Sequence, residues 1–170
     1  MTAFDDSFKQ LIGEEGTLST DRTDPGNWTG GAVGVGKLVG TKYGISAKSY
    51  PTIDIPDLTL ADAKAIAKRD YWDTVHGDDL PVAIAHALFD MAFNQGVMTA
   101  IKVFQRAVGV TQDGVFGDVT MAAFKAIPVA EFARSFTIFR ILRYSMTAGW
   151  INDAKGWIGR ALDSYAEILT

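Results

Sequence analysis

Apolar side chains recur at helical spacing along most of the chain. A stripe near the N-terminus predicts a helix over about residues 4–15. It consists of Phe4, Phe8, Leu11 and Ile12. Later stripes predict six more helices, over about residues 59–73, 80–95, 97–108, 121–127, 128–149 and 154–169. Because these stripes are wide, we expect the helices to pack against one another, which indicates a mainly α fold.

Residues with special backbone roles mark the ends of several predicted helices. Thr59 precedes Asp62 by three positions, which predicts a capping box at the start of the second helix. Pro81 suits the first turn of the third helix. Gly96 is expected to end that helix, because glycine readily adopts the backbone conformation found just beyond a helix.

The segment 26–44 is rich in glycine and does not have a helical pattern. Glycines alternate with valines here, and Gly30 and Gly31 suit a turn, so we predict one or two short hairpin strands. The run from Gly34 to Gly36 also suggests a phosphate loop. That alternative is disfavoured, because no buried strand precedes the run and no helix follows it.

Composition and charge narrow the class of protein. The 170 residues suffice for one sizeable core or two small lobes, and no run approaches the ~18 apolar residues of a membrane span. The chain has no cysteine, and its start lacks the basic and apolar regions of a secretory signal. The net charge of −4, with an acidic front and a mildly basic end, argues against nucleic-acid binding.

Glu15 is the first candidate for chemistry. At about 100° per residue it falls within the apolar stripe of the first helix, whereas Glu14 falls at its edge. Burial disfavours the charged form of a carboxylate, so the pKa of Glu15 is expected to rise, as a general acid requires. The alternative is an ordinary residue in the last helical turn before Gly16.

Asp24 supplies a second carboxylate nine positions later. It begins an Asp-Pro-Gly sequence, which predicts a tight turn. Two carboxylates held close together are what hydrolysis of a glycosidic bond requires. Asp21, earlier on the same loop, is a weaker candidate for the same role.

Three short sequences together resemble the N-terminal signature of glycoside hydrolase family 108. They are Glu15-Gly16, Asp24-Pro25-Gly26 and Thr41-x-Tyr43-Gly44-Ile45-Ser46. Members of that family are N-acetylmuramidases of phages, prophages and Gram-negative bacteria, some known as secretion activators. The chain departs from the family pattern at Thr17, where a second glycine would stand, at Ser46, which replaces threonine, and in an insertion over residues 27–40.

The resemblance implies hydrolysis of the β-1,4 bond between N-acetylmuramic acid and N-acetylglucosamine. It implies Glu15 as the general acid and Asp24 as the second carboxylate near the anomeric carbon. By similarity to phage lysozymes with a Glu/Asp/Thr triad, Thr41 would help Asp24 to hold the attacking water. A nucleophilic aspartate would not need that hydroxyl, so we predict inversion of the anomeric configuration.

Four further residues are candidates for substrate binding, namely Trp28, Tyr43, Asn94 and Gln95. For the two amides, a polar helix face or a cap is an equally good interpretation. Tyr71 and Trp72 are interpreted as core aromatics in preference to the lining of a sugar cleft. His76 and His86 have no neighbouring ligand residues in the sequence, so we expect no metal site, and no cofactor is implied.

A second pattern lies in the C-terminal half and resembles a type 3 peptidoglycan-binding module. It comprises Phe104-Gln105, Gly109-Val110, Asp113-Gly114, Gly117 and Thr120. Its residues suit a turn at Asp113 and a cap from Asp118 or Thr120, so the pattern indicates fold more strongly than ligand contact. We therefore predict a catalytic lobe over 1–92 and a binding-like lobe over 93–170, packed as one compact body.

The sequence thus predicts a lysozyme-like, mainly α (α+β) helical bundle with a small β-hairpin in its N-terminal half. The predicted function is that of an endolysin-type muramidase. It would act as a monomer on peptidoglycan glycan strands, made in a bacterial cytoplasm and released to the periplasm through a holin-type pore. The alternatives are a lytic transglycosylase and a non-catalytic wall-binding module.

Overall fold

The structure is a computed structural model that describes residues 2–12, 17–147 and 149–170. The chain forms two compact units, Met1–Arg69 and Asp70–Thr170. Most of the chain is helical, with one small antiparallel sheet, which confirms the predicted fold class. The predicted lobe boundary at residue 92 lies within a helix of the second unit, and the assignment of functions to lobes stays a prediction.

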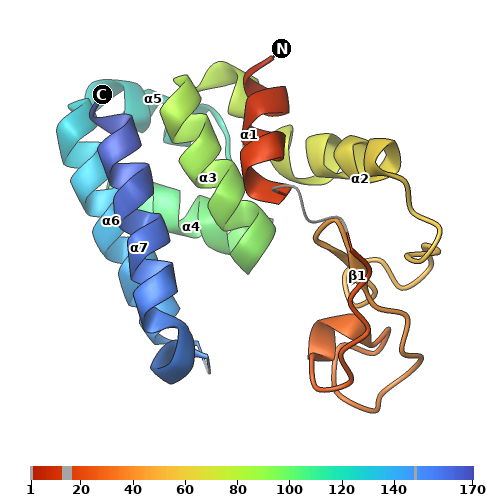
Figure 1. The fold of residues 1–170 in the computed structure, drawn as a ribbon. Helices are drawn as coiled ribbons and strands as arrows, with labels where there is room; N and C mark the ends of the chain where they lie inside the picture. The colour runs from red at the N-terminus through yellow and green to blue at the C-terminus, as the bar shows by residue number, and fades with distance from the viewer. Residues whose placement is uncertain (1, 13–16, 148) are drawn as a thin grey trace. The chain divides into compact units, whose positions relative to one another are not determined.

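The first unit contains helices α1 (Ala3–Ile12) and α2 (Leu60–Ala67) (Figure 1), and side chains of the two helices contact each other. Lys64 Nζ of α2 lies 2.6 Å from Asp5 Oδ1 of α1 and 6.0 Å from the centre of the Phe4 ring. Phe4 and Phe8 are buried, as the apolar stripe predicts. The predicted continuation of this helix toward Glu15 lies outside the described residues.

The start of α2 follows from its sequence. The Thr59 hydroxyl accepts a hydrogen bond from the backbone N–H of Asp62, and the Asp62 carboxylate accepts one from the backbone N–H of Thr59. The predicted capping box is therefore confirmed. Beyond Ala67 the helix widens into a π-helical turn, Lys68–Trp72, so the predicted helix continues to about its expected end in a different form.

The predicted hairpin exists, but not among the glycines and valines. The sheet consists of β1 (Thr41–Lys42) and β2 (Ile45–Ser46), with Thr41 opposite Ser46. Within the glycine-rich loop, strand-like pairing is confined to an isolated bridge between Trp28 and Leu38. Next to it, the N–H of Thr29 donates to the carbonyl of Lys37. Gly31, Gly34 and Gly36 have φ angles of 73°, 79° and 79°, which turn the chain too often for a strand. Val33 and Val35 are exposed, so no apolar face exists to stabilise one.

The second unit is a helical bundle. Its helices are α3 (Val82–Gln95), α4 (Val97–Ala107), α5 (Asp118–Ala126), α6 (Val129–Ser145) and α7 (Trp150–Ile168), preceded by a short 3₁₀ turn, Gly77–Asp79. Helix α3 packs against α4 and α7, while α6 packs against both α4 and α7, and α6 and α7 run side by side (Figure 1). Gly96, with φ of 88°, ends α3 as predicted.

Aromatic side chains fill the centre of this bundle. Phe104 of α4 lies 4.7 Å, ring centre to ring centre, from Phe132 of α6 and 5.4 Å from Phe124 of α5. Phe89 of α3 and the Trp72 indole form an edge-to-face pair with their ring centres 5.5 Å apart. Trp72 is fully buried, which confirms its interpretation as a core aromatic. Such ring pairs contribute about 0.5–1.5 kcal/mol each beyond the area they bury.

Buried Gln105 explains the C-terminal sequence pattern. Its Nε2 donates to Asp113 Oδ1, at 2.6 Å, and to the carbonyl of Val115, while its Oε1 accepts from the N–H of Gly114. The amide thus holds the Asp113-Gly114 turn, which supports the structural interpretation of the pattern. The predicted capping residue was wrong, because α5 begins after Gly117 without a side-chain cap, and Thr120 is instead buried against Gln105.

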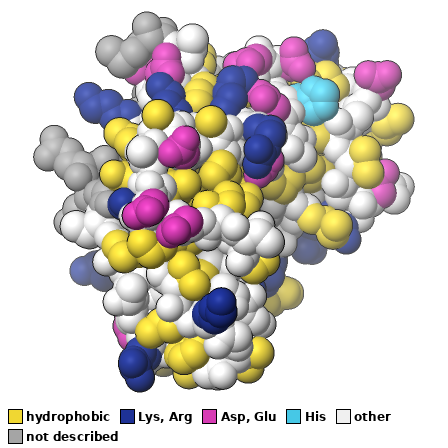
Figure 2. All heavy atoms as spheres, turned by 90° about the vertical axis from the view of Figure 1, so that its right-hand side faces the viewer, with side chains coloured by type: hydrophobic (Ala, Val, Ile, Leu, Met, Phe, Trp, Pro, Cys, Tyr) yellow, Lys and Arg dark blue, Asp and Glu magenta, His cyan; other side chains and the backbone are white. Residues whose placement is uncertain are grey.

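Three predicted helix bounds shift by several residues. Helix α5 begins at Asp118 in place of residue 121, α6 ends at Ser145 in place of 149, and α7 begins at Trp150 in place of 154. No helix in the described part of the chain is long and apolar enough to cross a membrane. Figure 2 shows acidic and basic side chains interspersed with apolar ones over the visible face.

Candidate active site and a second pocket

Glu15, the predicted general acid, and its neighbour Glu14 lie outside the described residues. The described part of α1 ends three positions before Glu15.

Asp24 begins the short 3₁₀ helix Pro25–Asn27. Its Oδ1 accepts a hydrogen bond of 2.7 Å from the N–H of Gly26, and the side chain is exposed. The predicted tight turn at Asp-Pro-Gly is thus present. Among the described residues no donor reaches Oδ2 of Asp24, so that oxygen can accept a hydrogen bond from water or substrate.

Asn27 joins the Asp24 turn to the segment that leads into Thr41. Its Nδ2 donates to the carbonyl of Asp21 at 3.0 Å, and its own carbonyl accepts from the N–H groups of Val39 and Gly40. Asn27 is completely buried. Because backbone groups on both sides meet the same residue, the two segments that carry Asp24 and Thr41 are held together.

Thr41 belongs to β1 and is tied on both sides. It pairs with Ser46 across the sheet, and two backbone hydrogen bonds of 2.9 Å join it to Ser19. Its side chain is half-buried, and its hydroxyl has no hydrogen-bond partner within the described ranges. The backbone of Thr41 is therefore fixed, while the hydroxyl is available to another group.

Tyr43 and Trp28 are both half-buried in this unit. Tyr43 occupies the tight turn between the strands with φ of 51°, an uncommon value for a residue with a side chain. The indole Nε1–H of Trp28 donates to the carbonyl of Arg22 at 3.0 Å, which fixes the ring against the loop that precedes Asp24.

Asp21 has a structural role on the same loop. The backbone N–H and the hydroxyl of Thr23 both donate to its Oδ1 at 2.8 Å. These hydrogen bonds stabilise the charged form and hold the pKa of the Asp21 carboxyl below its ordinary value. A carboxylate with a lowered pKa is a weaker base, and Oδ1 of Asp21 is already engaged, so Asp21 suits the role of Asp24 poorly.

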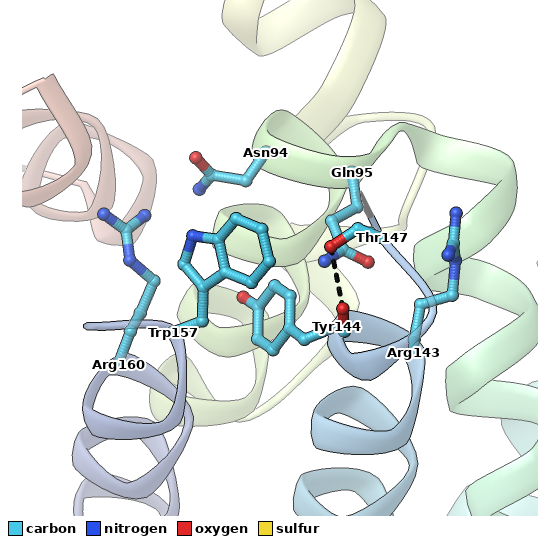
Figure 3. A pocket seen from close by; sticks show the side chains of 7 residues that line it. All are labelled: Asn94, Gln95, Arg143, Tyr144, Thr147, Trp157 and Arg160. Carbon is cyan, nitrogen blue, oxygen red and sulfur yellow. Dashed lines mark hydrogen bonds between the residues drawn. The ribbon is translucent and has the colours of Figure 1, made fainter. Parts of the chain in front are cut away.

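The two predicted amides lie in the second unit, on the last turn of α3. Asn94 and Gln95 line a pocket of about 340 Å³ together with residues of α6, α7 and the turn between them (Figure 3). Nδ2 of Asn94 donates to the carbonyl and to Oδ1 of Asp90 one turn earlier. Oε1 of Gln95 is buried and accepts no hydrogen bond from any described residue, a condition that typically costs about 1–3 kcal/mol.

An ion-pair network supports this pocket. Buried Asp90 accepts hydrogen bonds from Arg140 of α6 and, at 2.9 Å, from Arg160 of α7. Arg140 is completely buried and also donates to the Tyr144 hydroxyl at 3.0 Å. Sequence reasoning noted Asp90 and Asn94 on one helix face but missed the arginines, because they lie 50 and 70 positions away from Asp90 and have no local signal.

A metal site receives no support from the described side chains, since no group of three or more His, Asp or Glu residues converges among them. His76 instead stacks on Phe116 at 5.4 Å, and His86 Nδ1 lies 3.0 Å from Glu167 Oε2. The described partners of these histidines thus include an aromatic ring and a carboxylate, and neither histidine belongs to a described cluster of three ligand-type residues.

A family model described as Glycosyl hydrolase 108 matches residues 8–96, just over half of the chain. The chain belongs to glycosyl hydrolase family 108. Membership in this family supports the prediction that the protein is a glycoside hydrolase. All seven candidate residues, from Glu15 to Gln95, fall within the matched segment of this family 108 chain, whereas the pocket residues of α6 and α7 lie beyond it.

A solved structure extends the similarity to nearly the whole family 108 chain. SagA of Brucella abortus is 26% identical to it, with a TM-score of 0.80. The alignment covers 98% of this chain and 93% of SagA, so the bundle beyond residue 96 belongs to the shared fold. No curated protein sequence matches the chain.

Proposed function

We propose that this family 108 protein is an N-acetylmuramidase that hydrolyses the β-1,4 bond between N-acetylmuramic acid and N-acetylglucosamine in peptidoglycan. The observation that carries the proposal is the family match over residues 8–96, which spans Glu15, Asp24 and Thr41. The tie between the Asp24 and Thr41 segments through buried Asn27 supports a joint role for these two residues.

In the proposed mechanism, Glu15 protonates the glycosidic oxygen as the bond to the anomeric carbon breaks. The oxocarbenium-like transition state is attacked by a water molecule that the Asp24 carboxylate deprotonates. One oxygen of Asp24 is engaged by the N–H of Gly26, which leaves the other for water. The Thr41 hydroxyl forms a second hydrogen bond with that water, as donor or acceptor. This hydroxyl has no other partner in the described part of the chain.

This division of roles makes the enzyme inverting. A retaining enzyme uses its second carboxylate as a nucleophile at about 5–5.5 Å from the acid, whereas an inverting one leaves about 6.5–9.5 Å for water. A water held jointly by Asp24 and Thr41 belongs to the second case. NMR of the products at early times should therefore show the α-anomer first, and early β-anomer would contradict inversion.

Product analysis tests the reaction itself. We expect the protein to reduce the turbidity of permeabilised Gram-negative cells and to release muropeptides with reducing muramic acid ends. Muropeptides with 1,6-anhydro ends would identify a lytic transglycosylase. Intact walls after prolonged incubation would identify a non-catalytic wall-binding module.

We further propose an endolysin-type role in which the protein acts as a monomer on periplasmic peptidoglycan after holin-type release. The second unit would then help to bind the wall. Co-expression with a holin in a Gram-negative host should produce lysis that requires both proteins. Lysis by the muramidase alone would contradict the proposed route of release.

A further inference from the structure

The pocket of the second unit has a charge that its lining does not neutralise. Arg143 of α6 and Arg160 of α7 both line it, and Figure 3 shows them at opposite sides. No acidic side chain lines the pocket within the described part of the chain. Behind the wall, Asp90 is the one carboxylate shared by Arg160 and buried Arg140. Arg140 and Arg160 thus share one carboxylate, and Arg143 adds a further guanidinium with no described carboxylate partner, which leaves an excess of positive charge.

Between the two arginines lie uncharged side chains that could contact the uncharged parts of a ligand. Trp157 lines the pocket with its ring stacked on Tyr144, at 5.4 Å and 27°. The stacked pair supplies a rigid apolar wall, since Tyr144 is itself buried and held by Arg140. Gln95 adds an amide oxygen without a donor, which an N–H group of a ligand would satisfy. A ligand that fits has a carboxylate, an amide and a small apolar surface.

We infer that this pocket binds a carboxylate of peptidoglycan, with Arg143 as its principal partner. The inference rests on the proposed function, because peptidoglycan is the polymer on which the enzyme would act. The polymer carries carboxylates on its stem peptides and, once these peptides are removed, on the lactyl groups of muramic acid. Arg143 forms the charged hydrogen bonds, Gln95 accepts from a ligand amide, and Trp157 contacts its apolar part.

Arg143 is the informative residue to change. Arg160 is committed to Asp90, so its loss would also disturb the bundle, whereas no described carboxylate pairs with Arg143. Arg134 provides a matched control, because it is an exposed arginine of the same helix. It lies nine positions before Arg143, about 180° around α6 at 100° per residue.

The experiment uses the full chain with Glu15→Gln, so that no ligand is cleaved. Calorimetric titrations measure binding of two probes prepared from Gram-negative peptidoglycan with an amidase, namely the free stem peptide and the peptide-free glycan strand. We expect at least one probe to bind, and Arg143→Gln to weaken that binding about tenfold or more. Arg143→Lys should retain part of the affinity, and Arg134→Gln should retain all of it.

The probe whose binding Arg143→Gln weakens identifies which carboxylate the pocket recognises. Binding should also weaken as salt is raised, a measurement that needs no pocket variant. Failure of both probes to bind, binding insensitive to salt, or equal losses in Arg143→Gln and Arg134→Gln would each overturn the inference. Wall hydrolysis by the unmutated chain is scored separately, so a muramidase with an empty pocket and a peptidoglycan binder without activity are told apart.

Discussion

At the residue scale, the proposed chemistry depends most on Glu15. We predict that Glu15→Gln abolishes wall lysis and leaves folding intact, because the amide preserves size and has no proton to donate. Loss of general-acid catalysis typically costs about 10²–10⁴-fold. A turbidity assay with circular dichroism as a folding check measures both effects. Glu14→Gln is the control and should keep most activity, and residual lysis above about one per cent in Glu15→Gln would exclude the assignment.

Thr41 tests the water-holding part of the mechanism. Thr41→Val keeps the β-branched shape and the backbone pairing with Ser19 and Ser46, but removes the hydroxyl. We expect a lower kcat with little change in KM, because the lost group would contact the attacking water and not the sugar. Thr52→Val, at an exposed position, is the control and should keep its activity. Thr29→Val is unsuitable as a control, because the Thr29 hydroxyl accepts a hydrogen bond from the backbone N–H of Lys37. A Thr41→Val enzyme with full activity would refute the shared-water mechanism.

Asp90 is the residue on which the second unit depends electrostatically. Asp90→Asn leaves completely buried Arg140 without a counter-charge, and breaking a buried pair in this way typically costs about 3–5 kcal/mol. Urea unfolding should show this decrease in stability. Asp163→Asn, at an exposed position of α7, is the matched control and should unfold like the unmutated protein. Equal stability of Asp90→Asn and the parent would show that the pair is dispensable.

At the element scale, the capping box of α2 makes stability depend on pH. Hydrogen bonds from the Thr59 hydroxyl and backbone N–H hold the pKa of the Asp62 carboxyl below its ordinary value of 3.8. A lowered pKa in the folded state contributes stability above the unfolded value and loses it as the pH falls through the folded value. Asp62→Asn should therefore lower Tm at pH 7, and the difference should shrink below about pH 4.

The comparison for this helix is Asp57→Asn, an exposed aspartate just before the cap. Its Tm should follow that of the parent over the same pH range. A difference between Asp62→Asn and the parent that persists unchanged at pH 2 would mean that the amide disturbs α2 for reasons other than charge.

At the scale of the whole molecule, the structure predicts the fate of a fragment of residues 1–95. Helix α3 packs against α4 and α7, and its side chains Leu88, Phe89 and Met91 are fully buried. Truncation after Gln95 exposes this helix, so we expect an insoluble or molten fragment with a weak near-ultraviolet circular dichroism signal. A fragment that unfolds cooperatively and hydrolyses walls would show that the C-terminal half is a detachable module.

The sequence by itself determined features that depend on neighbours a few positions apart. Thr59 and Asp62 capped α2, Gly96 ended α3, and the apolar stripes identified the helices, because these signals depend on local backbone geometry and helical periodicity. The Asp24 turn was predictable for the same reason, since Pro25 and Gly26 restrict the local backbone. The family signature added candidate roles for Glu15, Asp24 and Thr41 but no geometry.

Only the tertiary structure decided which distant residues meet. The glycine-rich loop formed no strand because Val33 and Val35 had no apolar surface to cover, a condition that alternation alone does not reveal. Gln105 became the centre of the Asp113 turn, and Asp90 met arginines 50 and 70 positions away. The pocket arose in the same way, because its arginines and Trp157 come from two helices that pack side by side after residue 96. Burial and charge pairing between distant elements are properties of packing, and periodicity along the chain carries no record of them.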